Sequence, residues 1–135
     1  MNFFTSYFSN IRKLKFEGIV PINIARFPPK FYQGLSYKPL MPYGTILKLD
    51  EEEFRNKFSE MLKGLNPEKV VRELAELSKG QDLALVCYEA PANFCHRHLV
   101  ADWLNFYTKE SVIEFVPEEK PTEKQEDNTI FSDTI

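Results

Sequence analysis

The stretch LALVCY, residues Leu83–Tyr88, is an almost unbroken run of apolar side chains about as long as one strand. A strand that is covered on both faces has this composition, because neither face is left for polar side chains. Strands of this kind are typical of parallel sheets with helices on both sides. We therefore predict that Leu83–Tyr88 is the central strand of a largely parallel sheet.

The segments around this strand favour an α/β fold. Further strands are predicted at Phe3–Phe8, Ile19–Ala25 and Ser111–Val116. Helices are predicted after two N-terminal signals: Asp50 followed by Glu53 three positions later, and Asn66 followed by Pro67. The last helix is predicted to bury a stripe made of Leu99, Val100, Trp103, Leu104, Phe106 and Tyr107. The prediction is an α/β protein with a single small domain, whose mostly parallel sheet has about four or more strands flanked by helices.

Two segments do not fit this regular pattern. Residues 26–44 contain four prolines and no sustained periodicity, so we predict a long irregular loop there. Residues 117–135 are charged and polar, and we predict that they form a disordered tail after a domain at residues 1–116.

The composition also indicates the localisation of the protein and its possible binding partners. No apolar run approaches the ~20 residues that a membrane span needs, and the N-terminal order of aromatic and basic residues is not that of a secretory signal. We expect a cytoplasmic protein, with no membrane partner, whose two cysteines are free thiols or ligands and not a disulfide. Residues 1–48 hold seven basic side chains and one acidic one, interleaved with aromatics. Such a segment is either a solvated surface or a contact with phosphate or nucleic acid.

Both cysteines and both histidines of the chain lie within the 12 positions from Cys87 to His98. This segment leaves the predicted central strand at its carboxyl end, which is where open α/β sheets bind ligands. Asn93 is predicted to cap the next helix, so that Phe94, Cys95 and His96 form its first turn. Unpaired backbone N–H groups and the helix dipole favour an anion at such a turn.

Two kinds of chemistry are open to this segment. Cys95 can act as a nucleophile, with His96 or His98 as the acid or base, if its thiol pKa is lowered at the helix start. Alternatively, Cys87, Cys95 and His98 can hold Zn²⁺, although the paired spacing of structural zinc sites is missing. The sequence therefore predicts no required cofactor or metal, and it leaves Cys87 as a packing residue within an apolar strand.

The predicted anion site takes further residues from two strand ends. Arg26 follows the strand at Ile19–Ala25, and it meets Arg97 at the same edge if that strand lies next to the central one. The predicted ligand contacts are Arg26, Arg97, Lys30, Tyr32, Tyr88 and Glu89. Arginine can bind a phosphate or carboxylate through two hydrogen bonds, and the tyrosines can stack on or hydrogen-bond a ligand.

Three quoted segments resemble one known family. TSYF near the start, INIARFPPKFYQGLSYKPLMP in the loop and LVCYEAPANFCHRHLVADWL near the end are similar to the domain of unknown function DUF488, over about residues 3–107. The resemblance implies a small α/β domain found in bacteria, archaea and phages, with polar residues gathered at Arg26, Cys87–Glu89 and Cys95–Arg97. It implies no particular reaction. Many members end the first strand with a Gly-His-Ser-like sequence, and Thr5-Ser6-Tyr7 stands here instead.

These observations support two hypotheses. The first is an enzyme or binding domain for a phosphate-bearing or otherwise anionic ligand, such as a nucleotide or nucleic acid, with its site at the carboxyl edge of the sheet. The second is a non-catalytic module that contacts nucleic acid or protein through the basic, aromatic loop, or a small metal-binding domain.

Overall fold

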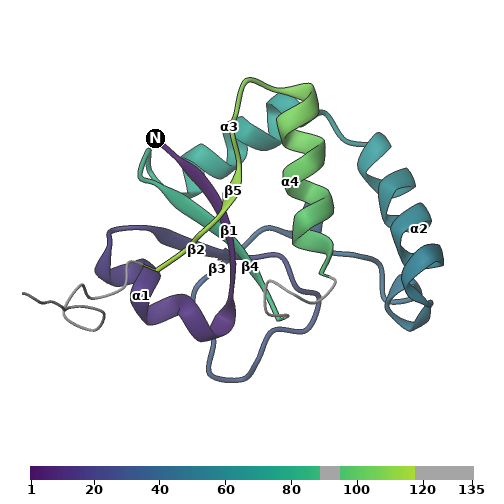
Figure 1. Cartoon of the computed structure of the whole chain (residues 1–135), viewed down its shortest axis with the longest axis horizontal. Coiled ribbons are helices and arrows are strands. Elements are labelled where there is room, and N and C mark those ends of the chain that lie inside the picture. The colour runs from purple at the N-terminus through teal and green to yellow at the C-terminus, as the bar shows by residue number, and fades with distance from the viewer. Residues whose placement is uncertain (89–94, 118–135) are drawn as a thin grey trace, which may run out of the picture.

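The computed structural model describes residues 1–88 and 95–117, which fold around one five-stranded sheet (Figure 1). The strands are β1 (Phe3–Tyr7), β2 (Val20–Asn23), β3 (Leu35–Ser36), β4 (Leu83–Cys87) and β5 (Ile113–Glu114). Their order across the sheet is β3-β2-β4-β1-β5, and every pairing is parallel. The predicted fold class is confirmed, and β4 is the central strand, with all five of its residues buried.

Four α-helices connect the strands in the described part of the chain. They are α1 (Ile11–Phe16), α2 (Glu51–Lys63), α3 (Pro67–Leu77) and α4 (His96–Tyr107). Short 3₁₀ helices lie at Phe8–Asn10, Lys38–Leu40 and Ile46–Lys48. None of these helices is both long and apolar enough to cross a membrane.

Both predicted helix starts are capped by the expected side chains. The Asp50 carboxylate accepts the N–H of Glu53 at 2.9 Å, and α2 begins directly after it. The Asn66 side chain accepts the N–H of Lys69 at 3.2 Å, with Pro67 as the first residue of α3. Each cap satisfies a backbone donor that the helix itself leaves without a partner.

The order of connections creates a crevice at the carboxyl edge of the sheet. The chain leaves β1 through α1 toward β2 on one side, and it leaves β4 through α4 toward β5 on the other side. Right-handed crossovers in opposite directions place α1 and α4 on opposite faces, as Figure 1 shows, and α2 and α3 pack with α4. The chain also leaves β2 toward β3, in the direction opposite to its exit from β4. Neighbouring strands β2 and β4 therefore form a topological switch point, the usual place of a ligand in such sheets.

Three expectations about elements need correction. The loop at residues 26–44 contains β3 and a 3₁₀ helix, because Asn23 and Ile22 of β2 pair with Ser36 and Leu35. The last strand is only two residues long. The α4 stripe ends at Leu104: Phe106 is 80% exposed and Tyr107 is 56% exposed, since this end of the helix extends past the core. The predicted tail lies almost wholly outside the described residues.

Candidate functional site

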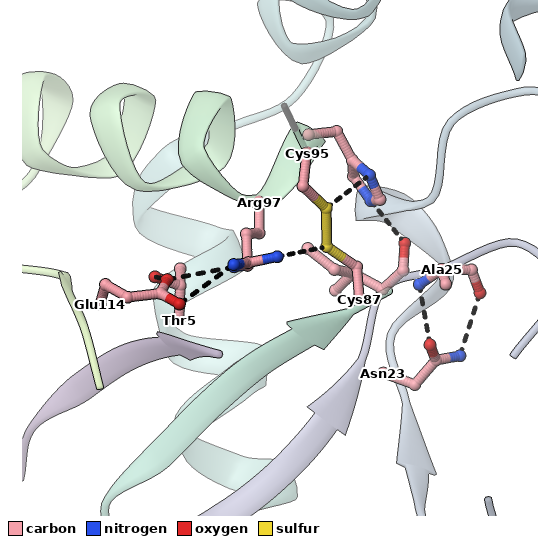
Figure 2. The surroundings of a disulfide bond; sticks show 9 residues. Thr5, Asn23, Ala25, Cys87, Cys95, Arg97 and Glu114 are labelled. Atoms are coloured by element: carbon pink, nitrogen blue, oxygen red, sulfur yellow. Dashed lines mark hydrogen bonds and ion pairs between the residues drawn. A yellow bond between two sulfur atoms is a disulfide. The ribbon is translucent and has the colours of Figure 1, made fainter. Parts of the chain in front are cut away.

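The two cysteines meet at the switch point. Cys87 is the last residue of β4, and Cys95 directly precedes α4. Their Sγ atoms form a disulfide, across a Cα–Cα distance of 7.3 Å (Figure 2). The expectation of free thiols is therefore wrong for this structure. That expectation rested on the reducing compartment predicted for the protein, and it did not take into account that the chain returns to the end of β4 at Cys95. Both side chains are almost fully buried.

His96 lies against this pair with its ring held in a defined orientation. Its Nδ1 is 3.9 Å from the Sγ of Cys95, and its Nε2 is 2.8 Å from the carbonyl oxygen of Ile24. A carbonyl only accepts, so Nε2 carries the hydrogen and Nδ1 turns its lone pair toward the sulfur. The ring also meets Phe58 of α2 edge-on at 5.2 Å between centroids. Burial lowers the pKa of His96 to about 4, which keeps the imidazole neutral at pH 7.

The carbonyl that orients His96 is itself fixed by a buried amide. The Asn23 side chain accepts the N–H of Ala25 at 2.8 Å and donates to the carbonyl oxygen of Ala25 at 3.0 Å. It also donates to the hydroxyl of Ser36 at 3.1 Å, which joins the end of β2 to β3. Asn23 therefore holds the turn that carries Ile24 and Arg26.

The three groups together form one cluster of donor atoms. The sulfurs of Cys87 and Cys95 and a ring nitrogen of His96 all lie within 4.8 Å of one another, and all three residues are buried. The spacing in the sequence had favoured His98 as the third donor. His98 is not in the cluster, and its buried Nε2 has no hydrogen-bond partner in residues 1–88 and 95–117. Burial is the largest cause of the lowered pKa of His98.

The helix start also differs from the prediction. Helix α4 begins at His96, with Cys95 as its extended N-cap residue, and the Cys95 side chain makes no capping hydrogen bond. Cys95 therefore precedes the first turn. Asn93 and Phe94 lie outside the described residues.

Arg97 is directed away from the crevice and into the core. Its side chain is fully buried, and Nε and Nη2 bind the two carboxylate oxygens of Glu114 at 3.1 and 3.0 Å (Figure 2). The Thr5 hydroxyl donates to the same carboxylate at 2.6 Å. Nη1 of Arg97 donates to the Sγ of Cys87 at 3.2 Å. Arg97 was predicted to hold an external anion, but the structure places its guanidinium between Glu114 and the sulfur.

A pocket of about 320 Å³ opens beside the cluster. Its lining residues come from the ends of β2 and β4, the start of α4, the loop before α2 and α2 itself: Ala25, Arg26, Phe27, Pro42, Leu47, Leu49, Glu51, Phe54, Cys87, Tyr88, Cys95 and His96. Arg26 is anchored in this wall by Nε, which donates to the carbonyl of Pro42 at 2.9 Å, and by Nη2, which lies 3.4 Å from that of Met41. No partner of Nη1 is found within residues 1–88 and 95–117. We call this cavity the rim pocket.

The other predicted contacts are divided between the pocket and the rest of the surface. Tyr88 lines the rim pocket, and its hydroxyl donates to the carbonyl of Phe27. Lys30 is exposed and Tyr32 donates to the carbonyl of Leu35; neither is among the described residues that line the pocket. Burial raises the pKa of Tyr32 to about 12. Glu89 lies outside the described residues.

Two residues of this site, Asn23 and Glu114, were not singled out in the sequence. Cys87 was considered both as a packing residue and as a zinc ligand. The available signal was a polar side chain inside an otherwise apolar strand, in INI for Asn23 and in VIEF for Glu114. A buried polar group needs a partner, so both positions indicate a built hydrogen-bond network.

The family model DUF488-N3a, described as the active DUF488-N3 subclade, matches residues 45–108. The matched segment carries α2, α3, β4 and α4, and with them Cys87, Cys95 and His96. Residues 45–108 thus match the DUF488 family that the sequence resembles. The resemblance noted in the sequence extends to residue 3, whereas the match begins at residue 45 and leaves out Arg26. Comparison with curated proteins and with solved structures gave no significant match.

Proposed function

We propose that this protein is an enzyme that acts on a small anionic ligand, with Cys87, Cys95 and His96 as its reactive centre. The observation that carries this proposal is that these three residues line the same pocket as Arg26. A site for chemistry needs a concave space, reactive groups with fixed geometry and a group that orients the substrate. The description of the matched subclade as active agrees with this proposal.

Arg26 is the residue that we assign to the anion. It is a cation in the pocket wall whose backbone partners use only part of its guanidinium, so N–H groups remain for a phosphate or carboxylate. The start of α4 adds the positive end of a helix dipole at the same edge. Phosphate-bearing compounds such as nucleotides are therefore the first ligands to test. Tyr88 lines the same pocket, and its ring is available to stack on the base of a nucleotide.

The test is a titration of the reduced protein with inorganic phosphate and with a mononucleotide, followed by NMR chemical shifts at low and high salt. A charge-assisted hydrogen bond contributes about 1.5–3 kcal/mol, so Arg26→Ala is expected to weaken binding about 10-fold or more. Arg72→Ala is the matched control, because Arg72 is an exposed arginine on α3 outside the pocket lining. Equal affinities in the two variants would contradict the assignment of Arg26.

Catalysis is tested separately from binding. Chromogenic phosphate and carboxylate esters serve as generic substrates, and any turnover is compared among the wild type, Cys95→Ser and Cys87→Ser. We expect both serine variants to lose turnover, because both sulfurs belong to the centre. Ligand binding with turnover unaffected by either substitution would indicate that the cluster is structural, and would favour the non-catalytic binding module.

A further inference from the structure

The donor cluster has the composition of a metal site, and its sulfur-to-nitrogen distance fits one; the two sulfurs become separate ligands when the disulfide is reduced. Zn²⁺ is bound at about 2.3 Å by cysteine sulfur and about 2.0–2.1 Å by histidine nitrogen, so tetrahedral ligand pairs lie roughly 3.6–3.8 Å apart. The observed distance from Cys95 Sγ to His96 Nδ1 is 3.9 Å, and all three donors lie within 4.8 Å of one another. Two thiolates and an imidazole form a nitrogen and sulfur donor set that suits Zn²⁺.

We propose that the reduced protein binds one Zn²⁺ through the Sγ atoms of Cys87 and Cys95 and the Nδ1 of His96, and that the fourth coordination position faces the rim pocket. The third ligand is thus His96 and not His98. This inference deepens the proposed function, on which it rests, by giving the reactive centre a chemical identity.

The surroundings of the three ligands are those of a metal site. A ligating histidine usually donates its other N–H to a carbonyl or carboxylate, and Nε2 of His96 points at the carbonyl of Ile24 at 2.8 Å. Asn23 braces that turn. Arg97 donates to the Sγ of Cys87 at 3.2 Å, which favours the thiolate that a metal requires. These partners orient the donors before any metal arrives.

The charges of the proposed centre balance without help from solvent. Two thiolates neutralise Zn²⁺, and Glu114 neutralises Arg97 beside them. Burying an uncompensated charge is costly, so a centre that closes at zero net charge fits a site whose ligands are almost fully buried. A monocarboxylate or phosphate ligand would then be matched by Arg26 at the pocket wall.

Three protein ligands with an open fourth position are the arrangement of catalytic zinc sites, whereas structural sites are closed by four. All three ligands line the rim pocket, so the open position is reached from the space assigned to the substrate. When bound, Zn²⁺ would polarise a substrate oxygen or activate a water molecule. Arg26 would hold the anionic part of the substrate in the same cavity.

The disulfide and the metal exclude each other. A dithiol reductant gives two electrons and two protons to the Cys87–Cys95 bond and is itself oxidised to a disulfide, leaving two thiols. Binding of Zn²⁺ to these thiols then releases their two protons. The oxidised protein is therefore an internal control that needs no substitution.

The experiment is a titration of the full chain with Co²⁺ as the spectroscopic probe, before and after treatment with dithiothreitol and anaerobic desalting. We expect no thiolate-to-metal absorption before reduction. After reduction we expect saturation at one Co²⁺ per chain, with tetrahedral ligand-field bands that Zn²⁺ abolishes. X-ray absorption of the zinc form should show two sulfur neighbours and one imidazole.

The variants distinguish the two histidines. Loss of an outer-shell partner alone weakens metal sites about 10–100-fold, so His96→Ala should weaken Co²⁺ binding by at least that factor. His98→Ala is the matched control and should bind as the wild type does, with circular dichroism used to confirm that both variants fold. If reduced wild-type protein binds no stoichiometric metal, or if His98→Ala loses as much affinity as His96→Ala, the proposal is overturned.

This outcome is separable from that of the proposed function. Phosphate titration of metal-free wild type and Arg26→Ala tests the anion contact without any metal. If Co²⁺ does not bind while Arg26→Ala still weakens phosphate binding, the metal site falls and the anion pocket stands. If Co²⁺ binds as expected and phosphate affinity does not depend on Arg26, the metal site stands and the anion assignment falls.

Discussion

Glu114→Ala should destabilise this protein far more than its position in a two-residue edge strand suggests. The Arg97 side chain is fully buried, whereas the Glu114 side chain is 21% exposed, and two hydrogen bonds join them. Removing one partner of a buried ion pair costs about 3–5 kcal/mol, because the remaining charge stays in a poorly solvating environment. Since Glu114 is partly solvated, we take the lower end and expect a loss of about 3 kcal/mol.

The loss is measured by urea denaturation, followed through the fluorescence of Trp103, the only tryptophan. For a domain of this size, about 3 kcal/mol corresponds to a fall in Tm of roughly 10 °C. Glu60→Ala is the control: its ion pair with Lys57 is 3.9 Å long with a 69% exposed carboxylate, so the change should stay within about 1 kcal/mol. Equal losses in Glu114→Ala and Glu60→Ala would refute the reasoning, since the buried charge would then not depend on Glu114.

A companion double variant checks the cause of that loss. Replacing buried ion pairs with apolar residues of similar size is often neutral or stabilising. Arg97→Met combined with Glu114→Gln keeps an acceptor for the Thr5 hydroxyl and removes both charges. It should therefore be less destabilised than Glu114→Ala alone. A larger loss in the double variant would mean that the arginine contributes through packing.

The remaining predictions concern the helices. Leu104→Ala should lower the free energy of unfolding by about 2–5 kcal/mol because Leu104 is fully buried, whereas Phe106→Ala should change it by less than about 0.5 kcal/mol because that ring is 80% exposed; urea denaturation compares the two. Asp50→Ala should cost about 1 kcal/mol by removing the acceptor for the Glu53 N–H, and Asp50→Asn, which keeps an acceptor, should cost less in the same assay.

The strands and helices could be predicted from the sequence wherever a local residue pattern fits only one kind of structure. An apolar run such as Leu83–Tyr88 fits a strand covered on both faces, and Asp50 and Asn66 have side chains that cap helices in a known way. The exposed end of α4 could not be predicted this way, because periodicity shows which face is apolar but not where the core ends. Phe106 and Tyr107 continue the helix beyond its neighbours.

The cluster of Cys87, Cys95 and His96 lies at the carboxyl end of the central strand, where the sequence placed the candidate site, but the partners within it were not assigned. Cys95, His96 and His98 have similar neighbours in the sequence, and only the direction of each side chain separates them. That direction depends on where α4 begins and on the carbonyl of Ile24, which is distant in the sequence. Arg97 was misread for the same reason, since its partner Glu114 lies on a strand 17 residues away.

The reassignment of Arg97 changes the chemistry that the pocket can carry out. If both arginines faced the pocket, the site would be a strongly cationic cradle and the cysteines would be secondary. With Arg97 committed to Glu114 and Cys87, Arg26 is the arginine among the described residues that lines the pocket, and the sulfur and imidazole groups line the same pocket. One cation can fix a single anionic group, and the donor cluster is then placed to act on the atoms next to it. This asymmetry, more than the number of basic residues, favours a reaction centre over an electrostatic contact with nucleic acid.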